Sequence, residues 1–441
     1  MMRSGGSETP ERFQQGRSPV LIALLFATLL ILGVPIAMVL GVTSLIVTAI
    51  AGDIPLVALP QYMFVGLDSF PLMAIPFFVL AGEVMGETGL SKRLIGFAQE
   101  LVGRIRGGLA QVNIVTSIFF GGITGAAVAD TAAVGSILIP SMKEEGYGAD
   151  YAAAITAASS AIGPIIPPSI ILVVYGISAR TSIAQLLIAG IVPGVLMGIS
   201  LSILAFWQAN RRGYPRIDQP FKLTGLIRAF WTAIPALVLP IIIVGGIVGG
   251  VFTPTEAASV AVAYAMVLGL LTGTLRVTRI PQVFLRASIT TGVVMLLIAV
   301  SNFFSMTLII HDIPRMVAEF FLGISQQRVV MLLMINVLLL LTGMFMEISA
   351  ATIILVPLLL PMVTELGVSP VHFGIIMSVN LAIGLATPPV GPTLFVASRI
   401  SGVGIEGITR AIWPFIVALI VALLIITFCE GLVLLLPRLL L

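Results

Sequence analysis

Charge is the property that this sequence lacks most. Asp, Glu, Lys and Arg together make up 9% of the 441 residues, whereas hydrophobic residues make up 59%. Because an ordinary soluble domain carries about a quarter charged residues, this composition predicts an integral membrane protein. The formal net charge of +3 is explained more simply by basic cytoplasmic loops than by nucleic-acid binding, and no nucleic-acid partner is expected.

Cysteine and histidine are nearly absent as well. The one cysteine, Cys429, lies in the last apolar segment, which excludes an intramolecular disulfide and a cysteine metal cluster. The two histidines, His311 and His372, stand at segment ends without a neighbouring acid and nucleophile. The sequence contains no catalytic constellation and no metal-ligand spacing, so neither an enzyme nor an organic cofactor is expected.

A cleavable signal peptide is also not expected. The first 18 residues are polar, and the apolar run that follows is far longer than the apolar core of a signal peptide. Residues 1–18, which include Arg3, Arg12 and Arg17, are predicted to form a cytoplasmic tail.

Long apolar runs make up most of the remaining chain. A helix needs about 20 residues to cross a bilayer, and the runs that meet this length are 19–50, 70–88, 150–180, 182–210, 230–252, 255–275, 288–310, 370–399 and 408–437. Two other runs, 109–142 and 328–363, are interrupted near the middle by small or polar residues. Because each half is short for a full crossing, both are predicted to be re-entrant hairpins.

Two amphipathic segments precede these hairpins. Residues 90–108 carry four basic side chains, and residues 312–325 carry Asp312, Arg315 and Glu319. Such segments favour helices that lie along the membrane interface.

The first apolar run, 19–50, permits either one long tilted helix kinked at Gly33 and Pro35 or two short helices. With one crossing and a cytoplasmic N-terminus, 18 of the 22 basic residues fall in inner segments, including the basic loop 211–229. The positive-inside rule therefore favours the single crossing. This choice places the C-terminus in the periplasm.

The apolar run 150–180 contains a break that a helix cannot pass through unchanged. Gly163 to Ser169 holds three prolines and one glycine; each proline removes an N–H donor and frees the carbonyl four residues earlier. In a bilayer, unwound backbone is tolerated only where protein buries it or where it lines a wet cavity. The break is therefore a candidate binding site.

The same pattern recurs 221 residues later. Residues 122–168 align with residues 343–389, and 13 of the 47 positions are identical, including the Ala-Ile-Gly and Pro-Pro sets of both breaks. In the predicted topology the two hairpins open to opposite sides, so the halves are inverted repeats. Paired broken helices in inverted repeats are typical of secondary transporters, where unwound carbonyls bind cations and half-helix N-termini attract anions.

At these residues the chain resembles the large membrane subunit of tripartite ATP-independent periplasmic (TRAP) transporters. The matching stretches are Leu67 to Phe78, Ala127 to Ala133, Gly163 to Ser169, Thr253 to Ala258 and Thr387 to Gly391. The resemblance implies a sodium-driven, elevator-type importer of organic acids such as C4-dicarboxylates or sialic acids in the bacterial inner membrane. It also implies two partners, a small membrane (Q) subunit of about four helices and a periplasmic substrate-binding (P) protein.

With this resemblance, two sodium sites are predicted, each between a hairpin and a break. Sodium is a hard cation and prefers carbonyl, hydroxyl and carboxylate oxygens. The two predicted ligand sets are Thr124, Ala126, Asp130, Gly163, Ile166 and Pro168 for the first site, and Glu347, Ser349, Thr352, Gly384, Thr387 and Pro389 for the second. Where family members often carry serines at the first tip, this chain has Thr124 and Ala126, so only the backbone of Ala126 can serve.

The carboxylates at the hairpin tips have a second interpretation. Asp130 and Glu347 could instead cap the second helix of each hairpin, since acids favour helix N-termini. No arginine lies near either break, so substrate recognition is assigned to hydroxyls, backbone N–H groups and helix dipoles. The candidate side chains for substrate are Ser169, Thr387 and Thr393.

The predicted fold is an all-α polytopic transporter with inverted repeats, two hairpins and two discontinuous helices. Its moving transport domain comprises 109–210 and 328–437, its scaffold 19–88 and 230–310, and its connecting arms 90–108 and 312–325. Two alternatives remain open: a sodium/anion carrier of the same superfamily that needs no binding protein, and an ion channel.

Overall fold

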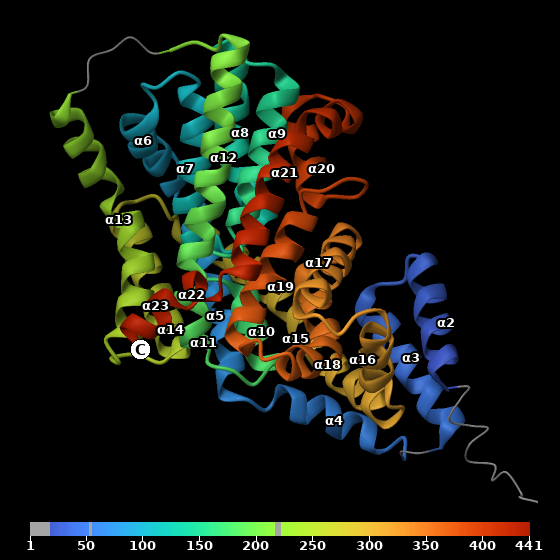
Figure 1. The fold of residues 1–441 in the computed structure, drawn as a ribbon. Coiled ribbons are helices and arrows are strands. Elements are labelled where there is room, and N and C mark those ends of the chain that lie inside the picture. The colour runs from blue at the N-terminus through green and yellow to red at the C-terminus, as the bar shows by residue number, and fades with distance from the viewer. Residues whose placement is uncertain (1–17, 53–54, 217–221) are drawn as a thin grey trace, which may run out of the picture.

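The computed structural model describes residues 18–52, 55–216 and 222–441, so the predicted tail lies almost wholly outside the described residues. Every regular element in these residues is a helix (Figure 1). Eight helices or continuous helix runs are long and apolar enough to cross a membrane: Phe70–Glu87, Ile183–Arg212, Leu223–Val248, Pro254–Leu271, Val277–Ile310, Arg328–Phe345, Ile348–Glu365 and Ile405–Phe428. Six coincide with predicted runs, which confirms a polytopic α-helical protein.

The first apolar run forms two helices, α2 (Ser18–Ile31) and α3 (Ile36–Ala51), joined by a turn in which Gly33 has a φ of 75°. Phe26 of α2 stacks on Phe304, and Gly41 of α3 lies against Val300. Both helices therefore contact α15 (Ile280–Ile310) at positions about one helical turn apart. They also pack directly on each other, so they run side by side. The prediction of one long tilted helix is wrong.

Four long helices and two short 3-10 turns border one side of the molecule. These elements are η1 (Phe70–Met73), α5 (Ala74–Glu87), α13 (Leu223–Val248), α14 (Pro254–Leu271), η3 (Val277–Arg279) and α15. Arg286 of α15 pairs with Glu83 at 3.2 Å and Glu87 at 2.7 Å on α5. The short helix α4 (Ala58–Leu67) has no buried residue and runs across the end of the molecule shown at the bottom of Figure 1.

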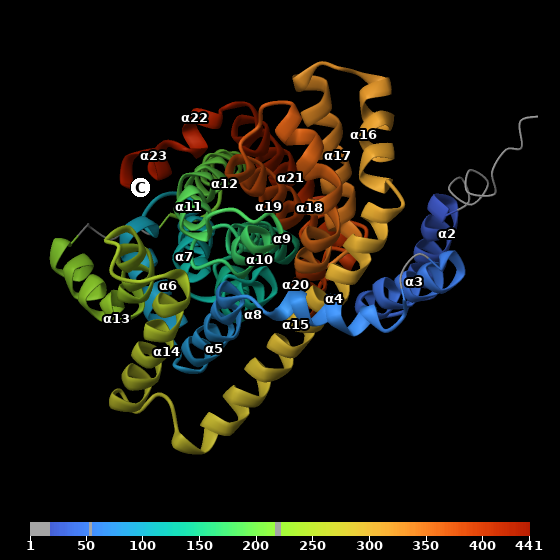
Figure 2. The same cartoon turned by 90° about the horizontal axis from the view of Figure 1, so that it is seen from below.

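The centre of the molecule is built from the two repeats. The first contains α7 (Gly108–Thr124), α8 (Ala127–Glu144), α9 (Ala149–Ser159), η2 (Ser160–Ile162), α10 (Ile170–Ser178), α11 (Ile183–Ala189) and α12 (Ile191–Arg212). The second contains α17 (Arg328–Phe345), α18 (Ile348–Glu365), α19 (Pro370–Gly384), α20 (Pro392–Ser401), α21 (Ile405–Phe428), α22 (Glu430–Val433) and α23 (Leu435–Leu440). Figure 2 shows α9, α10 and α19 in the middle of this body, and the side chains of α9 from Tyr151 onward are buried.

Both hairpins form as helix–turn–helix units, but their arms are longer than predicted. Each arm of the second hairpin has 18 residues, which corresponds to about 27 Å of helix and nearly matches a hydrocarbon core of about 30 Å. The hairpin predicted from the sequence is therefore present, with longer arms than expected.

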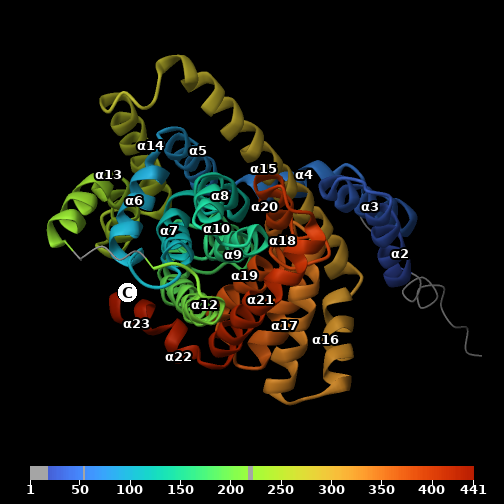
Figure 3. The ribbon, with the colours of Figure 1, turned by 90° about the horizontal axis from the view of Figure 1, so that it is seen from above.

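The amphipathic segments are helices α6 (Leu90–Val102) and α16 (Ile313–Ile324). Helix α6 buries its apolar face against α7 and α13 (Figure 3), and α16 packs on α18. The basic loop is shorter than predicted, because α12 continues to Arg212 and α13 already begins at Leu223.

Candidate functional site

The first hairpin turns within two residues. Helix α7 ends at Thr124, Gly125 adopts a left-handed φ of 61°, and Ala126 is extended before α8 begins at Ala127. A methyl group added at Gly125 would lie 2.7 Å from the carbonyl oxygen of Pro168. Glycine is required here both by the backbone conformation and by the close approach of the break.

The first broken helix unwinds where the prolines predict it. One 3-10 turn at Ser160–Ile162 ends α9, and α10 starts at Ile170 with Ser169 as its N-cap. The Ser169 hydroxyl accepts a hydrogen bond from Leu172 N at 3.1 Å and donates one to the Pro164 carbonyl. Ser169, a predicted substrate residue, is therefore fully buried, and its hydroxyl is hydrogen-bonded to backbone groups of the break and of α10.

The hairpin and the break are in direct contact, as predicted. Gly121 lies against Gly163, and Gly122 faces the carbonyl of Pro167. Among the described residues, no donor hydrogen-bonds to the carbonyls of Gly163, Ile166 or Pro168. Backbone carbonyls without a partner are oxygen ligands available to a hard cation.

A buried polar cluster lies beside this contact, on α7, α8, α9 and η2. Its hydrogen bonds are Asn113 Nδ2 to Thr156 Oγ1 at 2.7 Å, Ser159 Oγ to Asn113 Oδ1 at 2.9 Å, Ser117 Oγ to Ser159 Oγ at 3.1 Å, and Thr131 Oγ1 to Ser160 Oγ at 2.7 Å. Of these residues, only Thr131 could be identified in the sequence, because the repeat matches it with Thr352. The adjacent serines Ser159 and Ser160, directly before the break, were the one sequence feature that could have indicated the other members of the cluster.

Asp130 is the exceptional member of this region. Its side chain is fully buried and faces Ser117, whose hydroxyl is directed to Ser159 instead. Both carboxylate oxygens lack a hydrogen-bond partner among the described residues. A buried carboxylate without a partner is costly, so this position favours a bound cation or proton. The side chain does not cap α8, whose N-cap is Ala126.

The second hairpin is different at its tip. Glu347 is the N-cap of α18; its carboxylate accepts hydrogen bonds from Ala350 N and Ser349 Oγ, both at 3.0 Å. Glu347 is exposed. In this structure Glu347 therefore caps α18, which is the second of the two interpretations of this residue. Thr352 is buried, and its hydroxyl has no partner in the described part of the chain.

The second break runs from Leu385 to Gly391, between α19 and α20. Gly343 of α17 touches Gly384 so closely that a methyl group at Gly384 would lie 2.5 Å from the Gly343 backbone. Thr387 donates to the carbonyl of Ile383 at 2.7 Å. Thr393 donates to the carbonyl of Leu385 at 3.0 Å. The substrate candidates Thr387 and Thr393 thus stabilise the break locally.

The second break is less covered than the first. Pro389 is exposed, as is Val390, whereas the equivalent positions Pro168 and Ser169 are buried. Gly343 of the second hairpin, before its tip, contacts Leu381 and Gly384 at the end of α19. Pro389 therefore lies at an exposed surface, whereas Thr387 is buried.

Two broken helices, each paired with a helical hairpin, define a membrane transporter, and comparison with known proteins identifies its family. The profile described as tripartite ATP-independent periplasmic transporter, DctM component, matches residues 23–432. The chain belongs to this family, which consists of transporter permeases and not of enzymes.

Several relatives are similar along most of the chain. The sialic acid TRAP transporter large permease protein SiaM of Vibrio cholerae is 39% identical, covering 95% of this chain and 97% of the relative. The C4-dicarboxylate permease DctM of Rhodobacter capsulatus is 33% identical, covering 96% and 99%. The isethionate permease DctMQ of Oleidesulfovibrio alaskensis is 44% identical over 93% of this chain, which spans only 65% of that relative's length.

A solved structure has the same fold. The YdaH transporter of Alcanivorax borkumensis, described as having an unusual topology, superposes with a TM-score of 0.59 over 84% of this chain and 88% of its own, at 17% sequence identity. This likeness supports the fold class of the chain.

Proposed function

We propose that the chain carries out sodium-coupled import of an organic acid anion. The observation that carries this proposal is the contact between the first hairpin tip and a break whose carbonyls at Gly163, Ile166 and Pro168 receive no hydrogen bond from any residue that the structure describes. Beside it lies the carboxylate of Asp130, which has no hydrogen-bond partner in the same described ranges. Sodium, a hard cation, suits carbonyl and carboxylate oxygens; Thr124 and the backbone of Ala126 would complete the first site.

The second sodium site would form when the second hairpin closes on its break. Glu347, Ser349 and Thr352 would then approach Gly384, Thr387 and Pro389. Closure would cover Val390, which is exposed now, and would bring the starts of α18 and α20 together. Because helix N-termini carry partial positive charge, this arrangement would create a site for a carboxylate beside Thr393 and, across the centre, Ser169.

The orientation follows from charge. Lys143 at the end of α8 donates to the Ser401 carbonyl at the end of α20, so Arg399 lies at the same end as Lys143. The basic helix α6 and the last turn of α12 occupy this end too (Figure 1). By the positive-inside rule this end would face the cytoplasm. The C-terminal helices α22 and α23 would then lie on the periplasmic side.

The start of α2 would lie on the opposite side of the membrane from the one expected from the sequence. Because α2 and α3 run side by side, α2 starts at the end where α3 leads to α4, and α4 lies opposite α6 (Figure 1). The start of α2 would therefore face the periplasm. This proposed orientation differs from the cytoplasmic tail expected from the sequence, which depended on a single crossing between residues 19 and 50.

The two repeats, 109–210 and 328–437, would move together as an elevator against α2 to α5 and α13 to α15. Helices α6 and α16, which connect these parts, would serve as arms. The names of three relatives mention isethionate, sialic acid and C4-dicarboxylate, all acids, which supports an anionic substrate here. A small membrane subunit and a periplasmic binding protein would complete the system.

Reconstitution tests the proposal directly. Proteoliposomes would contain the chain and the small membrane subunit encoded with it, and the binding protein would be supplied outside with labelled organic acid. Uptake should require an inward sodium gradient and cease when potassium replaces sodium at equal ionic strength. Equal uptake in potassium would refute sodium coupling. Saturable uptake without the binding protein would favour an independent carrier, and unsaturable current would favour a channel.

A further inference from the structure

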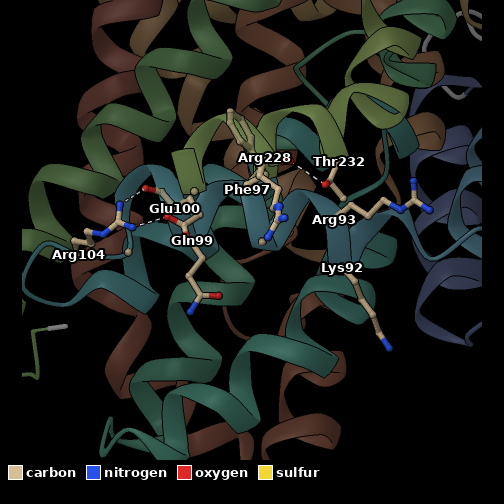
Figure 4. A pocket seen from close by; sticks show the side chains of 12 residues that line it. Lys92, Arg93, Phe97, Gln99, Glu100, Arg104, Arg228 and Thr232 are labelled. Carbon is tan, nitrogen blue, oxygen red and sulfur yellow. Dashed lines mark hydrogen bonds and ion pairs between the residues drawn. The ribbon is translucent and has the colours of Figure 1, made fainter. Parts of the chain in front are cut away.

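A basic cavity opens between α6 and the first part of α13, away from both breaks (Figure 4). Its volume is about 700 Å³. Its lining includes the charged residues Lys92, Arg93, Glu100, Arg104 and Arg228 and the aromatic residue Phe97. The cavity lies at the end of the molecule where α6 and the last turn of α12 are found (Figure 1), and neither predicted sodium site includes any of its lining residues.

Positive charge predominates among the side chains that line this cavity in the described part of the chain. Four of them are cationic and one, Glu100, is a carboxylate that is already paired with Arg104. Lys92, Arg93 and Arg228 have no ion-pair or hydrogen-bond partner for their charged groups among the described residues. Figure 4 shows the Arg104–Glu100 pair at one end of the cavity, Lys92 and Arg93 at the other, and Arg228 between them. Such an arrangement attracts an anion.

One wall of the cavity belongs to α13, a helix with exposed apolar side chains. On α13, Trp231 is 68% exposed, and Ile227 and Phe230 are exposed as well. Phe230 packs against Phe97 of α6, with ring centroids 5.7 Å apart. Aromatic residues of this kind beside basic ones are typical of the level of the lipid headgroups. An occupant could place its charged group in the cavity and its apolar part along α13.

We propose that this cavity binds the phosphate headgroup of an anionic phospholipid in the cytoplasmic leaflet. Basic pockets between transmembrane helices on the cytoplasmic side are suited to such headgroups. A zwitterionic lipid would bring its own cation next to Arg93 and Arg228, and a soluble phosphate would leave the exposed face of α13 unused. The bound headgroup connects α6, which leads into the first hairpin, to α13, so occupancy should influence transport.

Lipid binding to the purified full-length chain tests this proposal. Native mass spectrometry would record retention of phosphatidylglycerol by the wild type, by Arg93→Gln/Arg228→Gln, and by the control Arg276→Gln, a basic residue outside the cavity. We expect the double variant to bind phosphatidylglycerol at least about tenfold more weakly and the control to bind it normally. Equal retention by the double variant would overturn the proposal.

Three further arms identify the occupant. Phosphatidylcholine should bind weakly to all variants, and equal binding of this lipid would overturn the preference for anionic lipid. Millimolar inorganic phosphate should not displace phosphatidylglycerol; displacement would indicate a site for a soluble anion. If the chain purified with its small membrane subunit loses the lipid that the isolated chain retains, the cavity is a protein interface and the proposal fails.

Transport gives an independent readout. In liposomes of phosphatidylcholine with and without phosphatidylglycerol, wild-type uptake should increase severalfold with the anionic lipid. The double variant should show no such increase while keeping its sodium dependence. A response to lipid that is the same in wild type and double variant would contradict the functional consequence.

Discussion

The two hairpin–break units contain the same motif in different states. In the first, Gly125 meets Pro168, and the break from Gly163 to Ser169 is buried except for partial exposure of Ile166. In the second, the tip residue Glu347 is exposed and so is Val390 of the break. Because the repeats share the proline and glycine pattern, this difference arises from tertiary packing. It supports our proposal that the first unit is a preformed site and that the second opens and closes.

The largest effect is expected from Gly125→Ala. The substitution combines a left-handed φ of 61° with a methyl group 2.7 Å from the Pro168 carbonyl oxygen, so the tip must retreat from the break. Sodium-driven uptake should fall by at least about tenfold, since strain of 1–2 kcal/mol is already near a tenfold change.

A matched control separates the contact from the strain. Gly402 also has a positive φ, of 74°, but an added methyl group there meets nothing within 4 Å. Gly402→Ala should therefore lower stability without changing sodium dependence. If both variants reduce uptake equally, the contact between tip and break has no special role.

Asp130→Asn should have the next largest effect. Removing a buried carboxylate that lacks a partner should weaken sodium binding by about tenfold or more while raising the melting temperature of the sodium-free protein, because an unpaired buried charge is lost. The measurements are uptake against sodium concentration and thermal unfolding with and without sodium.

Asp150→Asn is the control, because Asp150 lies in the first turn of α9 and is half-buried. It should leave the sodium dependence unchanged. A lower melting temperature of Asp130→Asn, with unchanged sodium affinity, would show that the carboxylate is only structural.

Cysteine labelling tests the difference in access between the two breaks. Ser169 and Val390 are equivalent positions in the repeat, with exposures of 0% and 37%. In a Cys429→Ser background, Val390→Cys should react with a water-soluble thiol reagent at least about tenfold faster than Ser169→Cys, because modification of a buried group requires local opening. Sodium and substrate should slow the reaction at residue 390. Equal rates would remove the contrast between the units.

Glu347→Ala should have the smallest effect. Loss of an N-cap acceptor costs about 0.5–2 kcal/mol, so unfolding should occur at lower temperature and uptake should fall only severalfold. Glu347→Gln, which keeps an oxygen acceptor for Ala350 N, should restore stability. If Glu347→Gln weakens sodium binding as much as Asp130→Asn does, Glu347 contributes to the proposed second sodium site as strongly as Asp130 does to the first, and the two units are more alike than the structure indicates.

The positions of helices and breaks could be predicted because they depend on local chemistry. Prolines such as Pro168 and Pro389 lack an N–H donor, and Gly125 permits a backbone that other residues avoid. These effects act within a few residues and leave their mark in the sequence. The prediction failed at residues 19–50, where the choice between one helix and two was decided by packing of α2 and α3 on α15, which charge counting does not detect.

The candidate site was predictable only in part. The contact of the first tip with its break was expected from the repeat, but the cluster around Asn113, Ser117 and Ser159 was not, because single hydroxyl and amide residues on three helices form no linear pattern. The capping geometry of Glu347 was one of two interpretations, and the position of the tip relative to Val390 depends on how the second hairpin packs.

The sequence by itself determined that this chain is a helical membrane protein, where its helices break, and that its two halves repeat. These properties follow from hydrophobicity, proline and glycine, whose effects are local. Only the tertiary structure decided that Asp130 is buried without a partner, that one break is covered while the other is open, and that Arg93 and Arg228 share a cavity. Those properties depend on which side chains from distant segments come into contact. Residues that make such contacts have no fixed spacing along the chain, so the sequence alone does not reveal them.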